Sequence, residues 1–333
     1  MKYARFFSIF VFAAAGLYGM AGFYFLPLAN FEGDLTRMGK LPEALFGWTK
    51  EQPILDPNLM RQASWQEADV LVIGDSFSDP RIWQTALTRE GLHVRTESWA
   101  SVRAICDDFT PWLLRKGFKG KHVIFEIIER NVEEPPSKSI GCHKMEPHSS
   151  TSADQPRDPP ATWIDRSKAD YSGRLSVGIA TRSNVSKYEQ LSAQPDFKSW
   201  DAGGGSRMVR MANGCDLFSH LRCRDVLFYG GDNERDLAGS VLDNIGIINA
   251  RLQNLTPVWV IIPDKSTVYL RPEKKFWEEA ERRFQSPNVL KAFRQATQDK
   301  TVDLYPANNT HLSTTGYLFM GNLIYRAISA NRS

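Results

Sequence analysis

A serine early in the chain and a histidine near its end are residue types that can perform nucleophilic chemistry together. Ser76 lies in the sequence Gly-Asp-Ser-Phe at 74–77, and His311 ends the sequence Asn-Asn-Thr-His at 308–311. A serine hydroxyl becomes a nucleophile when a base removes its proton, and histidine is the usual base near neutral pH. The chain has six histidines. His311 is the one that follows a predicted late strand and precedes a predicted capped helix. We therefore predict Ser76 as nucleophile and His311 as base.

The elements predicted around Ser76 place it at an edge of a parallel sheet. Residues 68–73 form a nearly continuous apolar run followed by glycine, which is typical of a strand covered on both faces. Two further strands are predicted at 92–97 and 122–128, with helices at 81–90 and 104–116 and with Pro80 placed to open the first helix. This alternation predicts an α/β fold with a doubly wound parallel sheet, whose ligands bind at the carboxyl ends of the strands.

The same alternation resumes near residue 237 after a segment of different composition. Prolines and serines mark a surface excursion from residue 134, and we predict an insertion over 134–236. The elements expected after it are helices at 237–255, 272–284 and 287–298, strands at 257–262 and 301–305, and a closing helix from Ser313 to about Ala330. The predicted division is therefore residues 1–29, a tether at 30–67, and an α/β domain at 68–333 that carries the insertion.

The N-terminal residues predict a membrane anchor. Lys2 and Arg5 precede an uncharged stretch over residues 6–28, and a helix needs about 20 apolar residues to cross a bilayer. A cleaved signal peptide usually has an apolar region of about 7–15 residues, so we favour an uncleaved anchor, although Ala13 and Ala15 form a weak cleavage pattern. The basic residues before the span favour a cytoplasmic N-terminus. We expect a single-pass protein of the inner membrane, with its domain in the periplasm or otherwise outside the cytoplasm.

The cysteines indicate the cellular compartment of the protein, and the charge balance limits the classes of partner that it can bind. The four cysteines form an even set, which suits an oxidising compartment. We expect Cys215 to pair with Cys223, and a pair between Cys106 and Cys142 would tie the insertion to the core domain. No Cys-x-x-Cys spacing is present, so disulfides are favoured over zinc and we predict no metal or cofactor. A total of 41 basic against 38 acidic residues, net +3, argues against nucleic acid as a partner.

The two motifs together resemble the SGNH (GDSL-type) hydrolase family, and most closely its bacterial branch of alginate-type polysaccharide O-acetylation proteins. Gly-Asp-Ser-Phe at 74–77 and Asn-Thr-His at 309–311 carry the resemblance, in the usual order and at opposite ends of one α/β domain. It implies an SGNH-like (flavodoxin-like) sheet and an acyl-enzyme on serine. It also implies an O-acetyltransferase, favoured over an acetylesterase, that acts on an extracytoplasmic polysaccharide with a multi-pass membrane acyltransferase as partner.

The resemblance also implies oxyanion donors after the first three strands. The first donor is the backbone N–H of Ser76, with Asp75 beside it as a possible supporting residue. The stretches that match the second and third donors contain Ala100 or Ser101, where the family usually has glycine, and Asn131. Such donors stabilise the negative charge that develops on the substrate oxygen.

Two further segments are candidates for contact with a substrate. Arg130 can hold a substrate carboxylate or pair with Glu126 or Glu129. Residues 262–269 also resemble a segment of the alginate-type branch, which implies that Lys265 and Tyr269 line the edge of a cleft. The alternative for these two residues is a solvated turn.

The third member of the catalytic group departs from the family pattern. The family has an Asp two or three residues before the histidine, where it fixes the ring tautomer and stabilises the imidazolium. Here these positions hold Asn309 and Asn308. Either asparagine can orient His311 in a dyad, or an acid such as Asp303 or Asp232 can replace the missing one. The remaining alternatives are an inactive polysaccharide-binding protein and, with less support, a lipase or thioesterase.

Overall fold

The computed structural model describes residues 2–146, 154–164 and 170–330. The chain forms two compact units. The sheet unit comprises residues 51–162, 231–305 and 311–333, and the N-terminal unit comprises residues 1–50, 163–230 and 306–310. The predicted insertion at 134–236 contributes residues to both units, and residues 147–153 of its proline-rich part lie outside the described residues.

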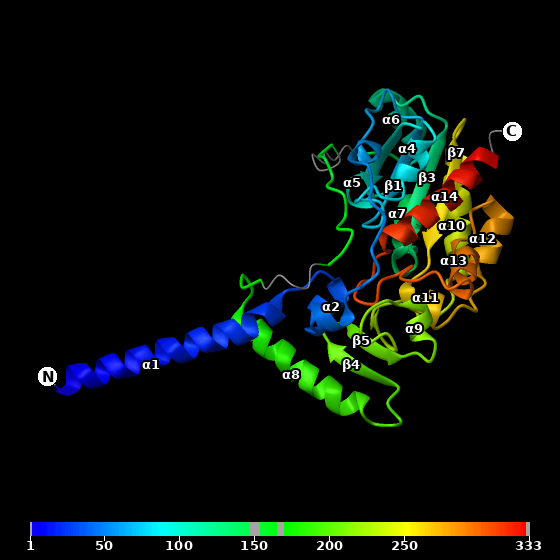
Figure 1. Cartoon of the computed structure of the whole chain (residues 1–333). Coiled ribbons are helices and arrows are strands. Elements are labelled where there is room, and N and C mark those ends of the chain that lie inside the picture. Colours follow the sequence, from blue (N-terminus) through cyan, green and yellow to red (C-terminus); the bar gives the residue numbers. More distant parts are fainter. Residues whose placement is uncertain (1, 147–153, 165–169, 331–333) are drawn as a thin grey trace. The chain divides into compact units, whose positions relative to one another are not determined.

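The sheet unit is built on a four-stranded parallel sheet (Figure 1). Its strands are β1 (Val70–Gly74), β2 (Val94–Ser98), β3 (His122–Ile128) and β7 (Thr256–Ile262), in the order β2-β1-β3-β7. The register pairs the last residue of β1 with the last of β2, and the last of β3 with the last of β7. The carboxyl ends of the strands therefore meet at one edge, and the predicted parallel α/β architecture is confirmed.

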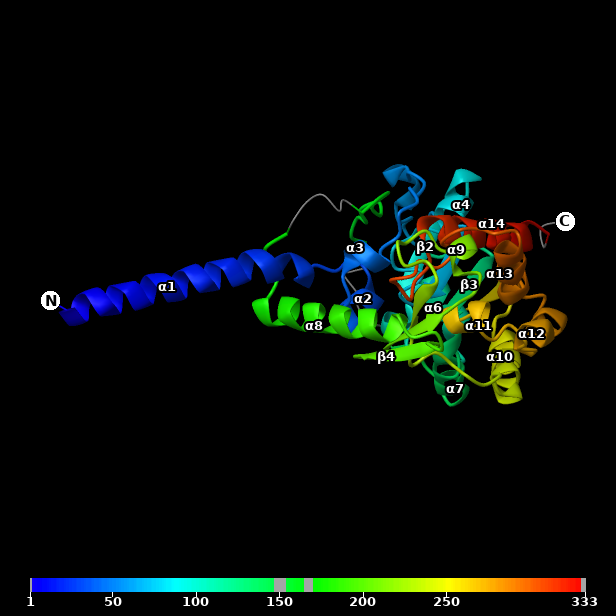
Figure 2. The ribbon, with the colours of Figure 1, turned by 60° about the horizontal axis from the view of Figure 1, so that its bottom comes forward.

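Apolar strands and the helices around them form the core of this unit. Every residue of β1 and β3 is buried, as expected for strands covered on both faces. The long closing helix α14 packs against α4 and β7, while α12 and α13 also contact β7 (Figures 1 and 2). The helices are α4 (Thr85–Arg89), α5 (Trp99–Val102), α6 (Phe109–Lys116), α7 (Glu134–Ile140), α10 (Gly239–Arg251), α11 (Lys265–Tyr269), α12 (Phe276–Phe284), α13 (Val289–Gln298) and α14 (Thr314–Ala330).

Two predicted elements at the ends of strands are wrong. Pro80 does not open a helix, because residues 76–80 form turns and α4 begins only at Thr85. Residues 302–305 form a turn and a bend instead of a last strand. Lys300 and Asp303 have φ angles of 57° and 56°, in the left-handed region, which an extended strand cannot contain.

The N-terminal unit contains the apolar helix α1 (Lys2–Phe25) and a small antiparallel sheet. The sheet consists of β4 (Ser199–Gly203), β5 (Ser206–Arg210) and β6 (Asp225–Tyr229) in that order. A 3-10 turn, η1 (Leu26–Ala29), follows α1, and the helices α2 (Asp34–Gly39), α3 (Glu43–Phe46), α8 (Leu175–Ser192) and α9 (Gly214–Leu217) complete the unit. The predicted tether therefore carries two helices, and at its other end a 3-10 turn, η2 (Pro57–Met60), in the sheet unit.

Helix α1 has the length and composition of a membrane span. Within the described residues, Tyr3–Ala29 is the one segment that is long and apolar enough, with a mean hydropathy of 1.8, and none of it is buried. Helix α8 packs against η1 and the end of α1, where the ring of Phe23 stacks on Tyr171 at 5.8 Å (Figures 1 and 2). The N-terminal helix is compatible with a membrane anchor or a signal sequence.

Both expected disulfides are present. Cys106 is bonded to Cys142 within the sheet unit, and Cys215 is bonded to Cys223 within the N-terminal unit. The first bond ties the segment before α6 to the residue after Gly141, next to the end of α7. Two disulfides suggest that the protein is located in an oxidising compartment outside the cytoplasm.

Removal of the Cys106–Cys142 bond is expected to lower the free energy of unfolding by about 4 kcal/mol, because it releases a long loop in the unfolded chain. The loop has a sequence separation of 36 residues. Urea unfolding of the Cys106→Ser/Cys142→Ser double variant measures this loss. An unchanged free energy of unfolding would contradict the prediction.

Candidate active site

The predicted nucleophile and base lie within hydrogen-bond distance. Ser76 Oγ is 2.9 Å from Nε2 of His311, and both residues belong to the sheet unit. Ser76 is exposed and His311 is half-buried, so a substrate can reach the hydroxyl. A separation of this size allows the imidazole to remove the hydroxyl proton. The structure thus brings together two residues that are 235 positions apart in the sequence.

Gly74 ends β1 and makes the tight turn to Ser76 possible. A Cβ at this position would lie 2.2 Å from Ser78 Oγ and 2.6 Å from a carboxylate oxygen of Glu126. Real atoms do not approach so closely, so any side chain at residue 74 would displace the turn. The glycine is therefore required by close approach of the groups beneath the turn.

Asp75 fixes the turn through both of its carboxylate oxygens. Oδ1 accepts the backbone N–H of Phe77 at 2.9 Å, and Oδ2 accepts the backbone N–H of Ile128 at 2.8 Å. The first bond closes a local turn of the kind that aspartate favours. The second ties the turn to the last residue of β3. Asp75 therefore supports the serine from the position where the sequence predicted a supporting role.

Phe77 supports the imidazole from one side. Its ring is buried and its centroid lies 4.6 Å from that of His311, with 34° between the planes. Tyr317 packs edge-on against the same phenyl ring at 6.1 Å. Just after the histidine, Ser313 donates its backbone N–H to Leu304 and its hydroxyl caps α14 by accepting the N–H of Gly316. The predicted cap at Ser313 is confirmed.

A buried carboxyl group lies beneath the serine turn. Glu126, on β3, accepts the hydroxyl of Ser78 and the backbone N–H of Asp75 on the same oxygen, Oε2. Trp83 donates its indole N–H to Ser78 Oγ at 3.1 Å, which completes the chain of bonds. Burial raises the pKa of Glu126 well above its ordinary value, and the nearby Asp75 carboxylate raises it further, so the neutral acid is favoured.

Sequence reasoning considered Glu126 only as a partner for Arg130, and its role under the turn was missed. The available signal was an acidic residue in an otherwise apolar strand, His-Val-Ile-Phe-Glu-Ile-Ile at 122–128. A lone carboxyl group in such a run must be neutralised or hydrogen-bonded when the strand is buried.

The backbone after β2 distinguishes between Ala100 and Ser101 as the second oxyanion donor. Ser98 caps the short helix α5, and its Oγ accepts the backbone N–H of Ser101 at 3.2 Å. The N–H groups of Ser76 and Ala100 have no hydrogen-bond acceptor in the described part of the chain. These two N–H groups are therefore available to a ligand, whereas that of Ser101 is occupied.

Asn131, the third predicted oxyanion donor, is exposed, whereas its neighbour Arg130 is paired with acidic side chains. Asn131 is exposed at the end of η3 (Glu129–Asn131), directly after β3. The guanidinium of Arg130 pairs with Asp264 at 2.6 Å and with Asp232 at 3.6 Å. Glu129 is occupied by Lys274. The acidic partners of Arg130 in this cluster are thus aspartates and not the glutamates predicted from the sequence.

The Arg130 cluster ties the ends of β3 and β7 together. Asp264 accepts Arg130 on one carboxylate oxygen and the backbone N–H of Asn233 on the other, and its own N–H donates to Glu129 at 2.9 Å. Burial raises the pKa of both Asp232 and Asp264, and the Arg130 charge opposes that rise. Arg130 is therefore held in place by the protein, next to the edge of the sheet that carries Ser76.

Lys265 and Tyr269 belong to helix α11, directly after Asp264. The Lys265 side chain is buried, with 1% of the residue exposed. The hydroxyl of Tyr269 accepts the backbone N–H of Tyr305 at 3.3 Å, and burial raises its pKa above the ordinary value. The alternative of a solvated turn is wrong, and the proposed contact of these residues with a cleft stays a prediction.

The candidates for the third catalytic position have well-defined neighbours. Asn308 is buried, and its side-chain amide donates to Glu43, while the N–H of Asn309 donates to Pro306 at 3.3 Å.

The two aspartates proposed as replacements also have partners within the protein. Asp232 accepts the N–H of Ser266 at 3.1 Å as well as pairing with Arg130. Asp303 is buried near Tyr269. The orientation of His311 by any of these side chains stays a prediction.

A cavity of about 600 Å³ adjoins Ala100. Trp99, Arg103, Glu134, Pro135 and Lys138 line its other sides. Arg103 has φ 64° and ψ −52°, and the N–H of Ala104 donates to the carbonyl of Val102, so Arg103 is the central residue of a strained γ-turn. Strained backbone of this kind gathers at ligand-binding sites.

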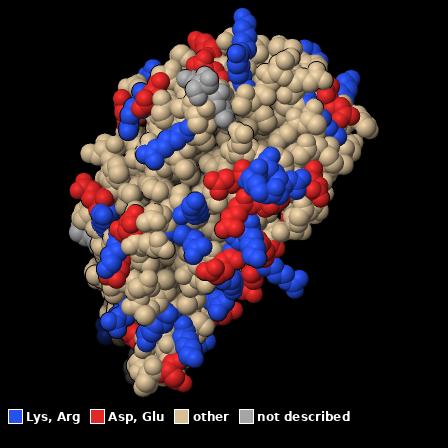
Figure 3. Space-filling model, turned by 90° about the vertical axis from the view of Figure 1, so that its right-hand side faces the viewer, with Lys and Arg blue, Asp and Glu red and all other residues tan. Residues whose placement is uncertain are grey.

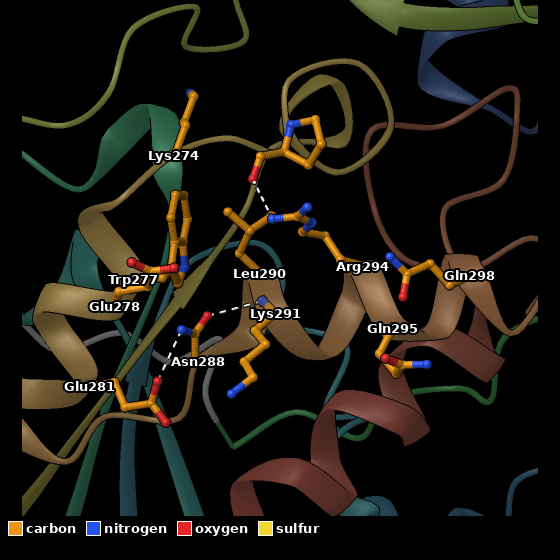
Figure 4. Close-up of a pocket in the computed structure, with 11 residues that line it drawn as sticks. Lys274, Trp277, Glu278, Glu281, Asn288, Leu290, Lys291, Arg294, Gln295 and Gln298 are labelled. Carbon is orange, nitrogen blue, oxygen red and sulfur yellow. Dashed lines mark hydrogen bonds between the residues drawn. The ribbon is translucent and has the colours of Figure 1, made fainter.

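A second pocket, of about 400 Å³, lies between α12 and α13 and contains none of the predicted site residues (Figure 4). Two of its polar side chains are hydrogen-bonded within the protein. Arg294 donates to the carbonyl of Pro272, and Asn288 bonds to Glu281 and to the N–H of Lys291.

On the face seen in Figure 3, basic and acidic side chains are interspersed.

Comparisons with known proteins do not identify the chain. No protein-family model, curated protein or solved structure matches it. Among the described residues, no group of three or more His, Cys, Asp or Glu side chains is arranged to hold a metal ion. A functional assignment therefore depends on the geometry of the site.

Replacement of Glu126 by Gln is expected to make the free energy of unfolding less sensitive to a rise in pH. A carboxyl group with a raised pKa in the folded state contributes stability that is complete below its unfolded pKa, near 4.5, and is lost as pH rises through the folded value. The amide lacks this loss, so the free energy of unfolding of Glu126→Gln rises relative to wild type by up to about 1.4 kcal/mol per pH unit. Urea unfolding from about pH 5 to about pH 8 measures the difference. A difference that does not change with pH would refute it.

Replacement of Arg103 by Gly is expected to raise the free energy of unfolding by about 1 kcal/mol, because glycine adopts a positive φ without strain. Arg326→Gly, at an exposed position inside α14, is the matched control and should lose about 1 kcal/mol. Urea unfolding of both variants measures whether the free energy of unfolding rises or falls in each. A loss of stability in Arg103→Gly would show that the γ-turn is not strained.

Proposed function

We propose that this chain is an exported, membrane-anchored acyl-transfer enzyme of the SGNH type, which acts on O-acetyl esters of an extracytoplasmic polysaccharide. The observation that carries the proposal is the 2.9 Å contact between Ser76 Oγ and His311 Nε2. It occurs at the carboxyl edge of a parallel α/β sheet, where such folds hold their sites.

The proposed mechanism has two half-reactions. His311 removes the proton from Ser76 Oγ, and the oxygen attacks the carbonyl carbon of an acetyl ester. The N–H groups of Ser76 and Ala100 stabilise the resulting oxyanion. His311 then returns the proton to the departing alkoxide, which leaves an acetyl group on Ser76. In the second half-reaction a sugar hydroxyl or water attacks this ester, with His311 again as the base, and free Ser76 is restored.

The turn beneath the serine supports this proposal because it restrains the reacting groups. Asp75 and Glu126 hold the backbone on either side of Ser76, and Phe77 restrains the His311 ring. Preorganised groups accelerate a reaction since their ordering does not have to occur at the transition state.

The proposed location, substrate and partner follow from the N-terminal helix, the disulfides and the family resemblance. The apolar N-terminal helix and the two disulfides support a membrane-anchored protein with its domain outside the cytoplasm. The resemblance to alginate-type proteins favours transfer to a polysaccharide over hydrolysis. It also favours a multi-pass membrane acyltransferase as the source of acetyl groups.

A polysaccharide-binding protein without activity is the second candidate function. The observation that favours it is the presence of Asn308 and Asn309 where the resembling family has an acid. Asparagine can accept a hydrogen bond from the histidine ring but gives no charge stabilisation to the imidazolium.

Covalent labelling of the full chain separates the two candidates. We expect a fluorophosphonate to label wild type, because a base within hydrogen-bond distance activates Ser76. Ser76→Ala should not be labelled, and His311→Ala should be labelled at least about a hundredfold more slowly. Ser137→Ala, which removes an exposed serine of α7, is the matched control and should behave as wild type. Equal labelling of wild type and Ser76→Ala would exclude Ser76 as the nucleophile.

A further inference from the structure

The cavity beside Ala100 is formed entirely by residues of the sheet unit. Its volume of about 600 Å³ lies within the range of about 300–1,000 Å³ that is usual for small-molecule sites. The register pairs Gly74 of β1 with Ser98 of β2. Ser76 and Ala100 each lie two residues further along, so they follow neighbouring strands at the same edge of the sheet. A molecule in the cavity is therefore beside the proposed oxyanion donor that lines it.

The two walls of this cavity are tied together by several bonds. One wall is α5 with the residue that follows it, and the other is the beginning of α7. Next to the walls, Ser139 Oγ accepts the backbone N–H of Ile105 at 2.9 Å. The guanidinium of Arg251 donates to the carbonyls of these two residues at 2.6 and 3.0 Å. The Cys106–Cys142 bond joins the same two segments, so the spacing of the walls is restrained.

The lining of the cavity combines apolar surface with charged side chains. Trp99 and Pro135 supply apolar surface, and the indole of Trp99 is held in place because its N–H donates to the carbonyl of Glu126 at 2.8 Å. Lys138 and Glu134 line the cavity as an ion pair. Apolar surface beside a few polar groups is typical of ligand sites, and it suits a sugar, which has C–H faces and a rim of hydroxyl groups.

Arg103 adds a positive charge to this lining. The residue is exposed, and no carboxylate of the described residues forms an ion pair with its guanidinium. An arginine fork binds a carboxylate or phosphate group through two parallel hydrogen bonds. Glycine would form the γ-turn at this position without strain, so a function of the arginine side chain explains why a strained residue is present here.

We propose that this cavity binds a sugar that carries an anionic group, a carboxylate or a phosphate, and that Arg103 selects this group. The inference rests on the proposed function, because it identifies the anionic sugar as part of the acyl acceptor. With its anionic group on Arg103 and its ring against Trp99 and Pro135, the sugar is held beside the acetylated Ser76.

The binding of the acceptor leads to the second half-reaction. A sugar hydroxyl oxygen forms a bond to the acetyl carbon while its proton passes to His311. The bond from that carbon to Ser76 Oγ then breaks, and His311 returns the proton to the serine oxygen. Holding the acceptor in place lowers the entropic cost of this step.

The test measures binding to the full chain with the Ser76→Ala change, in detergent micelles, so that no turnover occurs. The ligands are glucose, glucuronate and glucose 6-phosphate, which differ only at C6, and inorganic phosphate. The shift of the ¹⁵N-labelled indole N–H of Trp99 gives each dissociation constant. Arg103→Gln removes the charge and keeps a non-glycine residue in the γ-turn, and Arg326→Gln, at an exposed position of α14, is the matched control.

The expected result is a preference for an anionic sugar that depends on Arg103. At least one of the two anionic sugars should bind at least about tenfold more tightly than glucose, because the guanidinium pairs with the anionic group. Tighter binding of glucuronate identifies a carboxylate, and tighter binding of glucose 6-phosphate identifies a phosphate. Arg103→Gln should abolish the preference and Arg326→Gln should keep it, with similar thermal midpoints for the two variants.

Three outcomes would overturn the inference. One is equal binding of all three sugars, and another is a preference for the anionic sugars that survives Arg103→Gln. The third is inorganic phosphate that binds as tightly as glucose 6-phosphate, which would show a site for small anions only. Fluorophosphonate labelling of wild type tests the proposed function separately. If Ser76 is not labelled while the preference holds, the binding site stands and the proposed function fails.

Discussion

The missing side chain at residue 74 is the constraint on which the serine site depends. Because Gly74 has no Cβ, Ser78 and Glu126 can meet directly beneath the turn. This contact, with the two bonds that Asp75 accepts, holds Ser76 at the carboxyl end of β1 with its hydroxyl exposed. The serine is thus positioned by buried groups of the sheet, while its reactive atom remains accessible.

The histidine is restrained within the sheet unit by the residues that follow it and by Phe77. After His311, the cap of α14 and the bond from Ser313 to Leu304 fix the backbone within the sheet unit. Before it, Thr310 is held by Asp34 within the N-terminal unit. The imidazole packs against Phe77 within the sheet unit. Acyl transfer requires this degree of order, because Nε2 must remove a proton and later return it to a different oxygen.

Local sequence signals predicted the parts of the fold that depend on local physics. The apolar run at 122–128, the glycine that ends β1 and the cap at Ser313 all formed as expected, since burial and capping need only neighbouring residues. The strand expected at 301–305 did not form because Asp303 in its middle and Lys300 just before it adopt left-handed backbone, which composition does not reveal. The partners of Arg130 and Thr310 are 134 and 276 positions away in the sequence, so only the folded chain identifies them.

Ser76 is the residue proposed to receive the acyl group, and intact-protein mass spectrometry tests this role most directly. Brief incubation of the full chain with p-nitrophenyl acetate, followed by acid quench, should give a single acetyl adduct that peptide mapping locates at Ser76. His311→Ala should accumulate less adduct because deprotonation of the hydroxyl is slower. Acetylation at lysines alone, at equal levels in wild type and Ser76→Ala, would contradict the account and favour a binding protein.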